Sequence, residues 1–209
     1  MAYKTIIFDF DGTLADTVDT FIQIINDLSD EFNYHKATPE QVKEYRGKTA
    51  RELIKIYGIS KLRLIGFIKR VKLEFSRHMD TIEPCDGMLE IIRELHGKGY
   101  QLGILSSNSK GNIMYFCDKY RITEYFDFFA TDAGMISKTR AMRKTLKKHN
   151  LPNESTIYIG DELKDIHAAH HNHIPVIAVT WGVNTQEALK AAKPTWIAEE
   201  AGEIRKILK

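Results

Sequence analysis

The sequence has little of several features that would place it in a specialised class of protein. It contains two cysteines, Cys85 and Cys117, which lie far from each other and from any metal-like spacing. A disulfide framework is therefore not expected, and isolated thiols are typical of a reduced, cytoplasmic protein. No run of eighteen apolar residues is present, so no segment is predicted to span a membrane. The first residues enter an apolar stretch almost at once, without the layout of a signal peptide.

A large excess of charge of either sign is also missing. The chain has 30 Lys and Arg against 28 Asp and Glu, a net charge of +2 at pH 7. This balance does not predict a nucleic-acid partner or a membrane surface. A chain of 209 residues, 43% of them hydrophobic, is long enough for one good core and a small second lobe.

Two aspartates follow the first apolar run of the chain. Ile6-Ile7-Phe8 predicts a buried parallel strand, because it is β-branched and aromatic and ends abruptly at polar residues. Asp9 and Asp11 then start on the same side of an extended chain, and Gly12 allows a turn whose N–H groups point inward. At about 4 Å and an effective dielectric of about 20, two carboxylates repel by about 4 kcal/mol. The pair is expected to hold a proton or a cation; the alternative is a solvated Asp-Gly turn.

The next part of the chain has helical periodicity. Apolar residues recur at three- and four-residue steps from Val18 to Phe32, and capping boxes start at Thr38 and Thr49. Residues 16–83 are therefore predicted to be all helical, with no strand.

After residue 84 short apolar runs alternate with helical stretches. Strands are expected at 101–105, 125–130, 156–159, 176–179 and around 196–197. Such alternation predicts right-handed crossovers and a mainly parallel sheet covered on both faces. We expect an α/β fold, a Rossmann-like doubly wound core formed by residues 1–15 and 84–209. A small all-helical cap domain, residues 16–83, is inserted after the first strand.

Three more polar groups stand at the ends of predicted elements. Ser106 follows a strand, where a hydroxyl suits a phosphate oxygen or simply caps a helix. Lys138 lies near the start of a predicted helix. It is either part of this polar site or an ordinary solvated surface lysine. Asp161 and Asp165 follow the strand at 156–159 with a spacing that puts both carboxylates near one face of a helix, and such oxygen ligands suit Mg²⁺.

Four histidines near residue 170 offer another interpretation. The spacing of His167, His170, His171 and His173 puts imidazoles on one helix face, as in some zinc sites. No cysteine accompanies them, so a polar outer face is the preferred interpretation.

The polar groups occur together in a known pattern. They resemble the four-part signature of the haloacid dehalogenase-like phosphohydrolases. The four parts are Asp9-Phe10-Asp11-Gly12-Thr13-Leu14, Ser106, Lys138 and Gly160-Asp161. The resemblance covers nearly the whole chain and is to the phosphoglycolate phosphatase and β-phosphoglucomutase type, including the helical cap and the stretch Thr180-Trp181-Gly182.

The resemblance implies phosphoryl transfer through an aspartyl phosphate. Asp9 would be the nucleophile, and Asp11 would protonate the leaving oxygen and then take a proton from water. Mg²⁺ would be held by Asp9, the backbone carbonyl of Asp11, Asp161 and Asp165, the last directly or through water. The phosphoryl oxygens would be held by Ser106, Lys138 and the backbone amides of Phe10, Asp11 and Ser107. Thr13 would orient the loop.

The stretch Tyr45-Arg46-Gly47-Lys48-Thr49 resembles the family's specificity loop. Arg46 or Lys48 would there reach a carboxylate or second phosphate of the substrate. The alternative is two solvated surface cations.

The predicted function is a Mg²⁺-dependent phosphatase acting on a small phosphorylated metabolite, as a monomer or weak dimer. A sugar phosphomutase shares every core residue and remains an alternative. A true haloacid dehalogenase needs neither Asp11 nor a metal, and Asp161 and Asp165 argue against it. A phosphonatase needs a Schiff-base lysine in the cap; it stays an alternative, although no cap lysine has a distinctive setting. A phospho-acceptor signalling module is a remote alternative, because its acceptor lies in mid-chain and it has no large helical insertion.

Overall fold

The computed structural model describes residues 3–131 and 137–208, so most of the loop expected at 131–137 lies outside the described residues. The strands are β1 (Thr5–Phe8), β2 (Ala15–Asp16), β3 (Glu83–Pro84), β4 (Gln101–Leu105), β5 (Phe128–Ala130), β6 (Thr156–Gly160), β7 (Val176–Val179) and β8 (Trp196–Ala198). The helices are α1 (Val18–Asp27), α2 (Ser29–Phe32), α3 (Pro39–Tyr45), α4 (Ala50–Ile56), α5 (Lys61–His78), α6 (Met88–Gly97), α7 (Lys110–Lys119), α8 (Lys138–Lys148), α9 (Leu163–His171), α10 (Gln186–Ala191) and α11 (Ala201–Ile207). Short 3-10 helices occur at Met79–Thr81, Thr123–Tyr125 and Asn153–Ser155.

Six strands form one parallel sheet in the order β5-β4-β1-β6-β7-β8. In chain order of these strands this is the doubly wound arrangement 3-2-1-4-5-6, with β1 at the centre. Such sheets bind ligands beyond the carboxyl ends of their strands, where the winding reverses. The predicted Rossmann-like α/β core is confirmed.

Alternation along β1 divides the core between the two faces of the sheet. Ile6 and Phe8 pack into the apolar cluster that includes α6, α7 and α11, whereas Ile7 packs into the cluster that includes α8, α9 and α10. All three side chains are fully buried. A strand that is buried on both faces must be apolar at every position, which is why this run shows no polar alternation.

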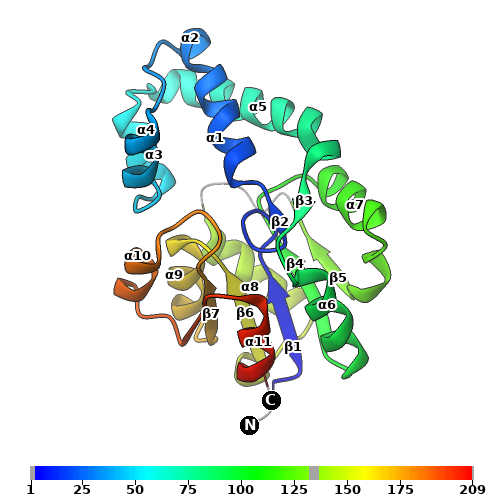
Figure 1. The fold of residues 1–209 in the computed structure, drawn as a ribbon. Helices are drawn as coiled ribbons and strands as arrows, with labels where there is room; N and C mark the ends of the chain where they lie inside the picture. The colour runs from blue at the N-terminus through cyan, green and yellow to red at the C-terminus, as the bar shows by residue number, and fades with distance from the viewer. Residues whose placement is uncertain (1–2, 132–136, 209) are drawn as a thin grey trace.

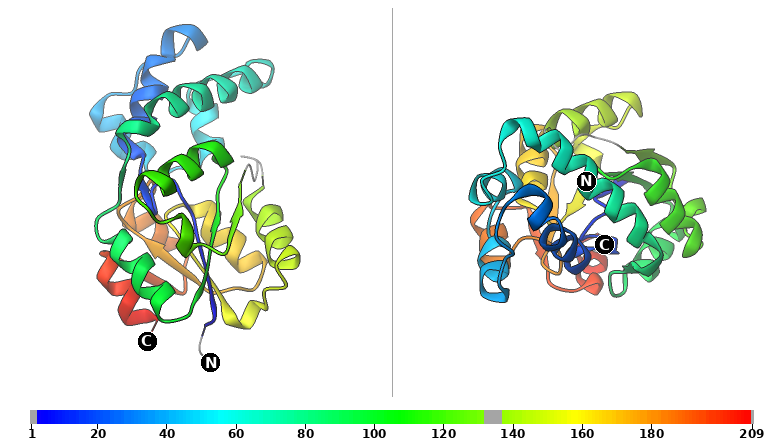
Figure 2. Two further views of the ribbon diagram at one scale, coloured as in Figure 1. Left: turned by 90° about the vertical axis from the view of Figure 1, so that its right-hand side faces the viewer. Right: turned by 90° about the horizontal axis from the view of Figure 1, so that it is seen from above.

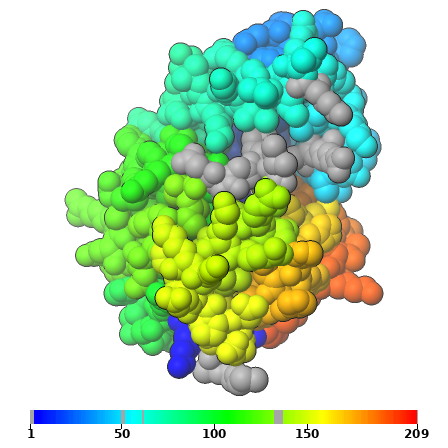
Figure 3. Space-filling model, turned by 180° about the vertical axis from the view of Figure 1, so that it is seen from behind, coloured from blue at the N-terminus to red at the C-terminus, as the bar shows by residue number. Residues whose placement is uncertain are grey.

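The helices α1 to α5 are inserted between β2 and β3 and lie over the carboxyl ends of the sheet strands (Figures 1 and 2). Seen from behind, the insertion sits on the core as a separate layer (Figure 3). Its helices pack on one another through apolar side chains that include Ile24, Phe67 and Val71. The predicted division of the chain at residues 15/16 and 83/84 stays a prediction, and the helices between β2 and β3 are consistent with it.

Two details of the insertion differ from expectation. Residues 16–83 were predicted to contain no strand, but Asp16 and Glu83 pair in the antiparallel ribbon β2–β3, which connects the insertion to the core. Two residues per strand are too few to give an alternation signal. The single helix expected from Val18 to Phe32 is divided at Leu28, and its second part ends at Asn33 in the left-handed conformation.

No helix within residues 3–131 and 137–208 is long and apolar enough to cross a membrane.

Candidate active site

Neighbouring strands bring the first two predicted metal ligands together. β1 pairs with β6 so that Phe8 lies opposite Ile159, and the Asp9 amide donates to the Ile159 carbonyl at 2.8 Å. Asp9 follows the carboxyl end of β1, and Asp161 follows that of β6. Parallel pairing therefore places residues about 150 positions apart in sequence at the same edge of the sheet.

Asp165 joins them from the first turn of α9. Its Oδ2 accepts a hydrogen bond from the Glu162 amide at 3.1 Å, as the reciprocal half of a capping box. Ligand oxygens of Asp9, Asp161 and Asp165 lie within 4.8 Å of one another, and all three residues are buried. We call these three residues the acid cluster.

Lys138, the first residue of α8, is the cation that faces this cluster. Its Nζ lies 2.7 Å from Asp9 Oδ2 and 3.2 Å from Asp165 Oδ1, and the residue is 7% exposed. Burial opposes a charged amine, but the carboxylates of Asp165 and Asp9 hold the pKa of Lys138 above its ordinary value. The structure therefore brings Lys138 to the predicted place.

Lys138 alone does not neutralise three buried carboxylates, and the nearby Lys164 pairs with Glu162. Burial raises the pKa of Asp165 to about 7, with Lys138 opposing the shift and Asp9 adding to it. Burial and the neighbouring carboxylates of Glu162, Asp9 and Asp165 raise the pKa of Asp161 well above its usual range. Asp161 and Asp165 therefore favour bound protons, and a bound cation would relieve the repulsion in the cluster.

The acid cluster fits a divalent cation. Asp165 Oδ1 is buried, and apart from its ion pair with Lys138 it has no hydrogen-bond partner in the part of the chain that the structure describes. Glycines leave room beside Asp161, because a Cβ on Gly12 or Gly182 would lie 2.3 or 2.2 Å from its Oδ2. Gly12 also has φ +72°, which favours glycine. An all-carboxylate oxygen set is the kind that Mg²⁺ and similar hard cations prefer.

Asp11 stands beside the cluster and not within it. Its carboxylate accepts from Asn108 Nδ2 at 3.0 and 3.3 Å. Burial and Asp9 raise the pKa of Asp11 to about 7, and the bond from Asn108 opposes this shift. A carboxyl that is partly protonated at neutral pH can both give and take a proton, as the predicted role requires.

The orientation of the Asn108 amide is fixed by its other partners. Its Oδ1 accepts from the Ser109 amide and from Asn112 Nδ2, both at 2.8 Å, so Nδ2 must point to Asp11. Sequence reasoning did not single out Asn108. Its position directly after Ser106-Ser107 was the signal that could have found it.

The predicted phosphate-binding residues lie around the same edge. Ser106 is fully buried at the end of β4, and its Oγ accepts from the Asn108 amide at 3.0 Å; Ser107 is half-buried. Phe10 turns its ring into the core against Phe116, and its amide donates to Asp9 Oδ1 at 2.8 Å. This agrees with the expectation that Phe10 contributes only its backbone.

Thr13 contacts a predicted metal ligand directly. Its Oγ1 donates to Asp161 Oδ1 at 2.7 Å, and the residue is fully buried. Trp181 Nε1 donates to the Thr13 carbonyl at 3.3 Å, so the loop after β7 also supports this turn.

The two predicted specificity cations of the insertion are both engaged. Arg46 Nε donates to the Val183 carbonyl at 3.2 Å, and Arg46 Nη2 donates to the Gly182 carbonyl. Lys48 forms an ion pair with Glu44 at 3.1 Å. The structure thus places Arg46 against the core loop after β7.

A second lysine near the acids was missed by sequence reasoning. Lys164, in the first turn of α9, pairs with Glu162. Burial opposes its charge, but the carboxylates of Glu162, Asp9 and Asp165 hold its pKa above the ordinary value. In the sequence Lys164 looks like an ordinary lysine on the exposed face of a helix, so nothing indicated that it lies near the acids.

The four histidines near residue 170 do not form a metal site. The acid cluster is the one group of potential ligands that comes together among the described residues. His167, His170, His171 and His173 are all exposed. The preferred interpretation of a polar outer face agrees with this.

Comparison with known proteins agrees with the geometry. Residues 6–179 match the model of the haloacid dehalogenase-like hydrolases. A phosphoglycolate phosphatase of Synechococcus elongatus is 29% identical over 201 residues, covering 96% of this chain and 95% of that protein. Pyrophosphatase PpaX of Listeria monocytogenes is 26% identical over 213 residues, covering 98% and 96%.

Solved structures show the same fold. A protein described as a predicted phosphatase from Clostridium acetobutylicum has a TM-score of 0.87 at 22% identity and covers 100% of this chain and 99% of its own. A β-phosphoglucomutase candidate from Thermotoga maritima has a TM-score of 0.70 at 20% identity and covers 99% and 100%. With the family model matching most of the chain, the protein belongs to the haloacid dehalogenase-like hydrolase family.

Proposed function

We propose that the protein is a Mg²⁺-dependent phosphatase that hydrolyses a small phosphate monoester through a phosphorylated Asp9. The observation that carries this proposal is the meeting of Asp9, Asp161 and Asp165 with Lys138, under a helical insertion and beside the proton-holding Asp11. The likeness to a phosphoglycolate phosphatase and to pyrophosphatases supports a phosphatase over other family activities.

Asp9 and Asp11 divide the chemistry between them. An Asp9 oxygen attacks phosphorus, and the ester oxygen leaves with the proton of Asp11. Water then attacks the same phosphorus and gives a proton to Asp11. The bond between phosphorus and the Asp9 oxygen breaks, phosphate leaves, and both side chains return to their starting states. The pKa of about 7 for Asp11 suits a group that must act first as acid and then as base.

The repulsion between an anionic ester and Asp9 needs opposing charge. Asp9, Asp161, Asp165 and the Asp11 carbonyl would hold Mg²⁺, which supplies positive charge to the phosphoryl oxygens when bound. Lys138 holds the Asp9 carboxylate in place and offers a second positive charge beside it. Ser106 and the amides of Phe10, Asp11 and Ser107 would bind the remaining phosphoryl oxygens.

The insertion makes small substrates the expected class. It lies over the strand ends, so a closed site would exclude water and large macromolecules (Figure 1). A role for Arg46 or Lys48 in substrate selection stays a prediction. We further propose a cytoplasmic monomer or weak dimer without nucleic-acid or membrane partners; the buried free thiols Cys85 and Cys117 support a reducing compartment.

A sugar phosphomutase is the second candidate, because it needs the same core residues and a mutase candidate shares the fold. Turnover of a hexose 1-phosphate only when it is primed by its bisphosphate would identify a mutase. A stable phospho-protein after acetyl phosphate treatment, without turnover, would instead identify a signalling module.

The test is a screen of phosphorylated metabolites with Mg²⁺, run on the wild type, on Asp9→Asn and on Asp30→Asn. Asp30 is an exposed residue of α2 and serves as the control. We expect phosphate release from one or more esters, lost in Asp9→Asn and kept in Asp30→Asn. Equal release by Asp9→Asn, with its fold intact, would contradict the proposal.

A further inference from the structure

The insertion touches the core at a second place, away from the strands that connect them. The loop after α3 meets the loop after β7, and we call residues 46–48 and 182–185 together the latch. Besides the two bonds from its guanidinium, Arg46 accepts a hydrogen bond at its own carbonyl from the Thr185 amide at 3.1 Å. Both side-chain and backbone groups of Arg46 are therefore used in this contact.

Asn184 is the central side chain of the latch. It is 2% exposed, and its Nδ2 donates to the carbonyls of Arg46 at 2.7 Å and Lys48 at 3.2 Å. Its Oδ1 accepts from the Leu163 amide at 2.8 Å. One buried amide thus joins the insertion to the first residue of α9, the helix that carries Asp165.

The same core loop also holds the acid cluster. The Val183 amide donates to Asp161 Oδ2 at 2.7 Å, and the Asn184 amide donates to the Asp161 carbonyl at 3.4 Å. The loop therefore contacts Asp161 on one side and the insertion on the other. Any movement of the insertion that breaks the latch removes partners from a loop that positions a predicted metal ligand.

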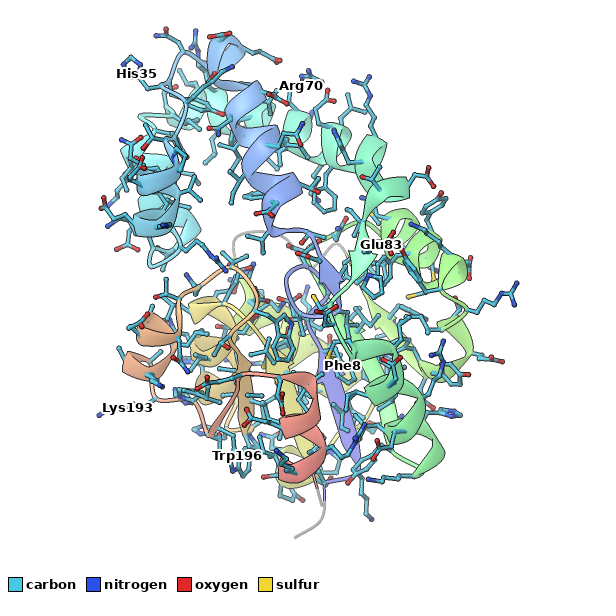
Figure 4. The ribbon with its side chains drawn as sticks, in the orientation of Figure 1. Phe8, His35, Arg70, Glu83, Lys193 and Trp196 are labelled. Atoms are coloured by element: carbon cyan, nitrogen blue, oxygen red, sulfur yellow. The ribbon has the colours of Figure 1, made fainter. Side chains whose placement is uncertain are left out.

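The connecting strands are fixed separately. Tyr120 Oη donates to the Ile82 carbonyl at 2.9 Å, and Lys119 Nζ donates to the Asp80 carbonyl at 2.7 Å, so α7 holds the segment that leads into β3. Glu83 marks this junction in Figure 4. Because β2–β3 is the covalent connection, a swing of the insertion about this ribbon would break the latch.

We propose that Asn184 is a positioning residue that couples closure of the insertion to the arrangement of the acid cluster. The proposal rests on the proposed phosphatase function. With the latch formed, the Asn184 amide is satisfied on both sides, and Val183 holds Asp161 in place. With the latch broken, the Asn184 Nδ2 loses both carbonyl partners and the loop is no longer held from above. Closure over the substrate and ordering of Asp161 are then one event.

This role separates Arg46 from a substrate-binding residue. If Arg46 serves the latch, Arg46→Met weakens closure for every substrate, and kcat/KM falls by about the same factor, on the order of tenfold, across a panel of esters. If Arg46 binds a second anionic group, the fall is confined to esters that carry one.

The decisive experiment is amide hydrogen exchange on the full-length protein without substrate. Arg46→Met removes the donors and keeps an apolar stem of similar length. Arg63→Met is the matched control, because Arg63 Nη1 bonds the Phe32 carbonyl at 3.4 Å inside the insertion. We expect protection of the Val183 and Thr185 amides to fall by about tenfold in Arg46→Met and to stay unchanged in Arg63→Met.

A double-mutant cycle tests Asn184 itself. If Arg46 and Asn184 act as one unit, Arg46→Met/Asn184→Ala loses no more kcat/KM than the worse single variant. Unchanged protection of Val183 and Thr185 in Arg46→Met, or fully additive losses, would overturn the proposal. The exchange result is obtained without turnover, so it stands or falls separately from the phosphatase function.

Discussion

Replacing Asp161 with asparagine measures how much the carboxylates of the acid cluster lower the free energy of unfolding of the metal-free protein. The pKa of Asp161 lies well above its ordinary value in the folded protein, because of burial and then the carboxylates of Glu162, Asp9 and Asp165. A carboxyl with a raised folded pKa binds more protons when folded than when unfolded. The free energy of unfolding therefore falls as pH rises from the unfolded pKa towards the folded one, by about 1.4 kcal/mol per pH unit for each such group.

Asparagine removes this charge and keeps the local bonds. Its amide oxygen can accept from the Val183 amide, and its NH₂ can donate to Thr13 Oγ1. In the metal-free protein, the free energy of unfolding of the wild type should fall more steeply than that of Asp161→Asn as the pH rises from 5 to 7. Urea unfolding in EDTA, followed by circular dichroism at several pH values, gives this difference.

Mg²⁺ should stabilise the wild type more than Asp161→Asn. A ligand at about 100 times its Kd stabilises the folded state by about 2.7 kcal/mol, which raises the Tm of a chain of this size by about 5–10 °C. The wild type and Asp30→Asn should show this shift at pH 8, and Asp161→Asn should lose most of it. If Asp161→Asn keeps the wild-type pH slope and the wild-type Mg²⁺ shift, the assignment of the acid cluster is wrong.

Three further changes test the same site. Gly182→Ala puts a methyl group against the buried Asp161 carboxylate, so we expect a loss of about 1–3 kcal/mol in the free energy of unfolding and a loss of turnover. Gly111→Ala, on α7, is the control, because its methyl group would enter open space; this variant should be neutral or stabilising in the same unfolding measurements. Lys138→Met leaves the acids unpaired and should cost about 3 kcal/mol in urea unfolding at pH 8. The cost should be smaller at pH 5, where Asp165, with a pKa of about 7, holds a proton; an equal cost at both values would refute the pairing. Asn108→Ala removes a bond that lowers the pKa of Asp11, so the alkaline limb of the kcat/KM profile should move to higher pH, and an unmoved limb would show that Asp11 is not the acid.

The sequence was sufficient for the parts of the site that depend on short stretches of chain. Asp9 and Asp11 follow one strand, and Asp161 and Asp165 follow another with a helical spacing. Parallel pairing then brings these stretches together without further information. The position of Lys138 at the start of α8 came from the family resemblance, since its own neighbourhood reads as a solvated basic helix.

Residues whose role depends on distant partners could not be predicted. Asn184 meets Arg46 only because the insertion lies over the core, and the two are 138 positions apart in the chain. Asn108 is oriented by a helical neighbour, Asn112, whose side chain looks like any polar helix residue in the sequence. The β2–β3 ribbon depends on pairing between residues near 16 and 83, which no local pattern records.

The most direct test of the account is to trap the phosphorylated protein. Protein mixed with a ³²P-labelled substrate and Mg²⁺ is quenched in acid within milliseconds, digested and mapped by mass spectrometry. We expect label on the peptide that contains Asp9, released by hydroxylamine as expected for an acyl phosphate, and no label in Asp9→Asn. Substrate turnover with no labelled peptide in any quench, or label on another residue, would contradict it.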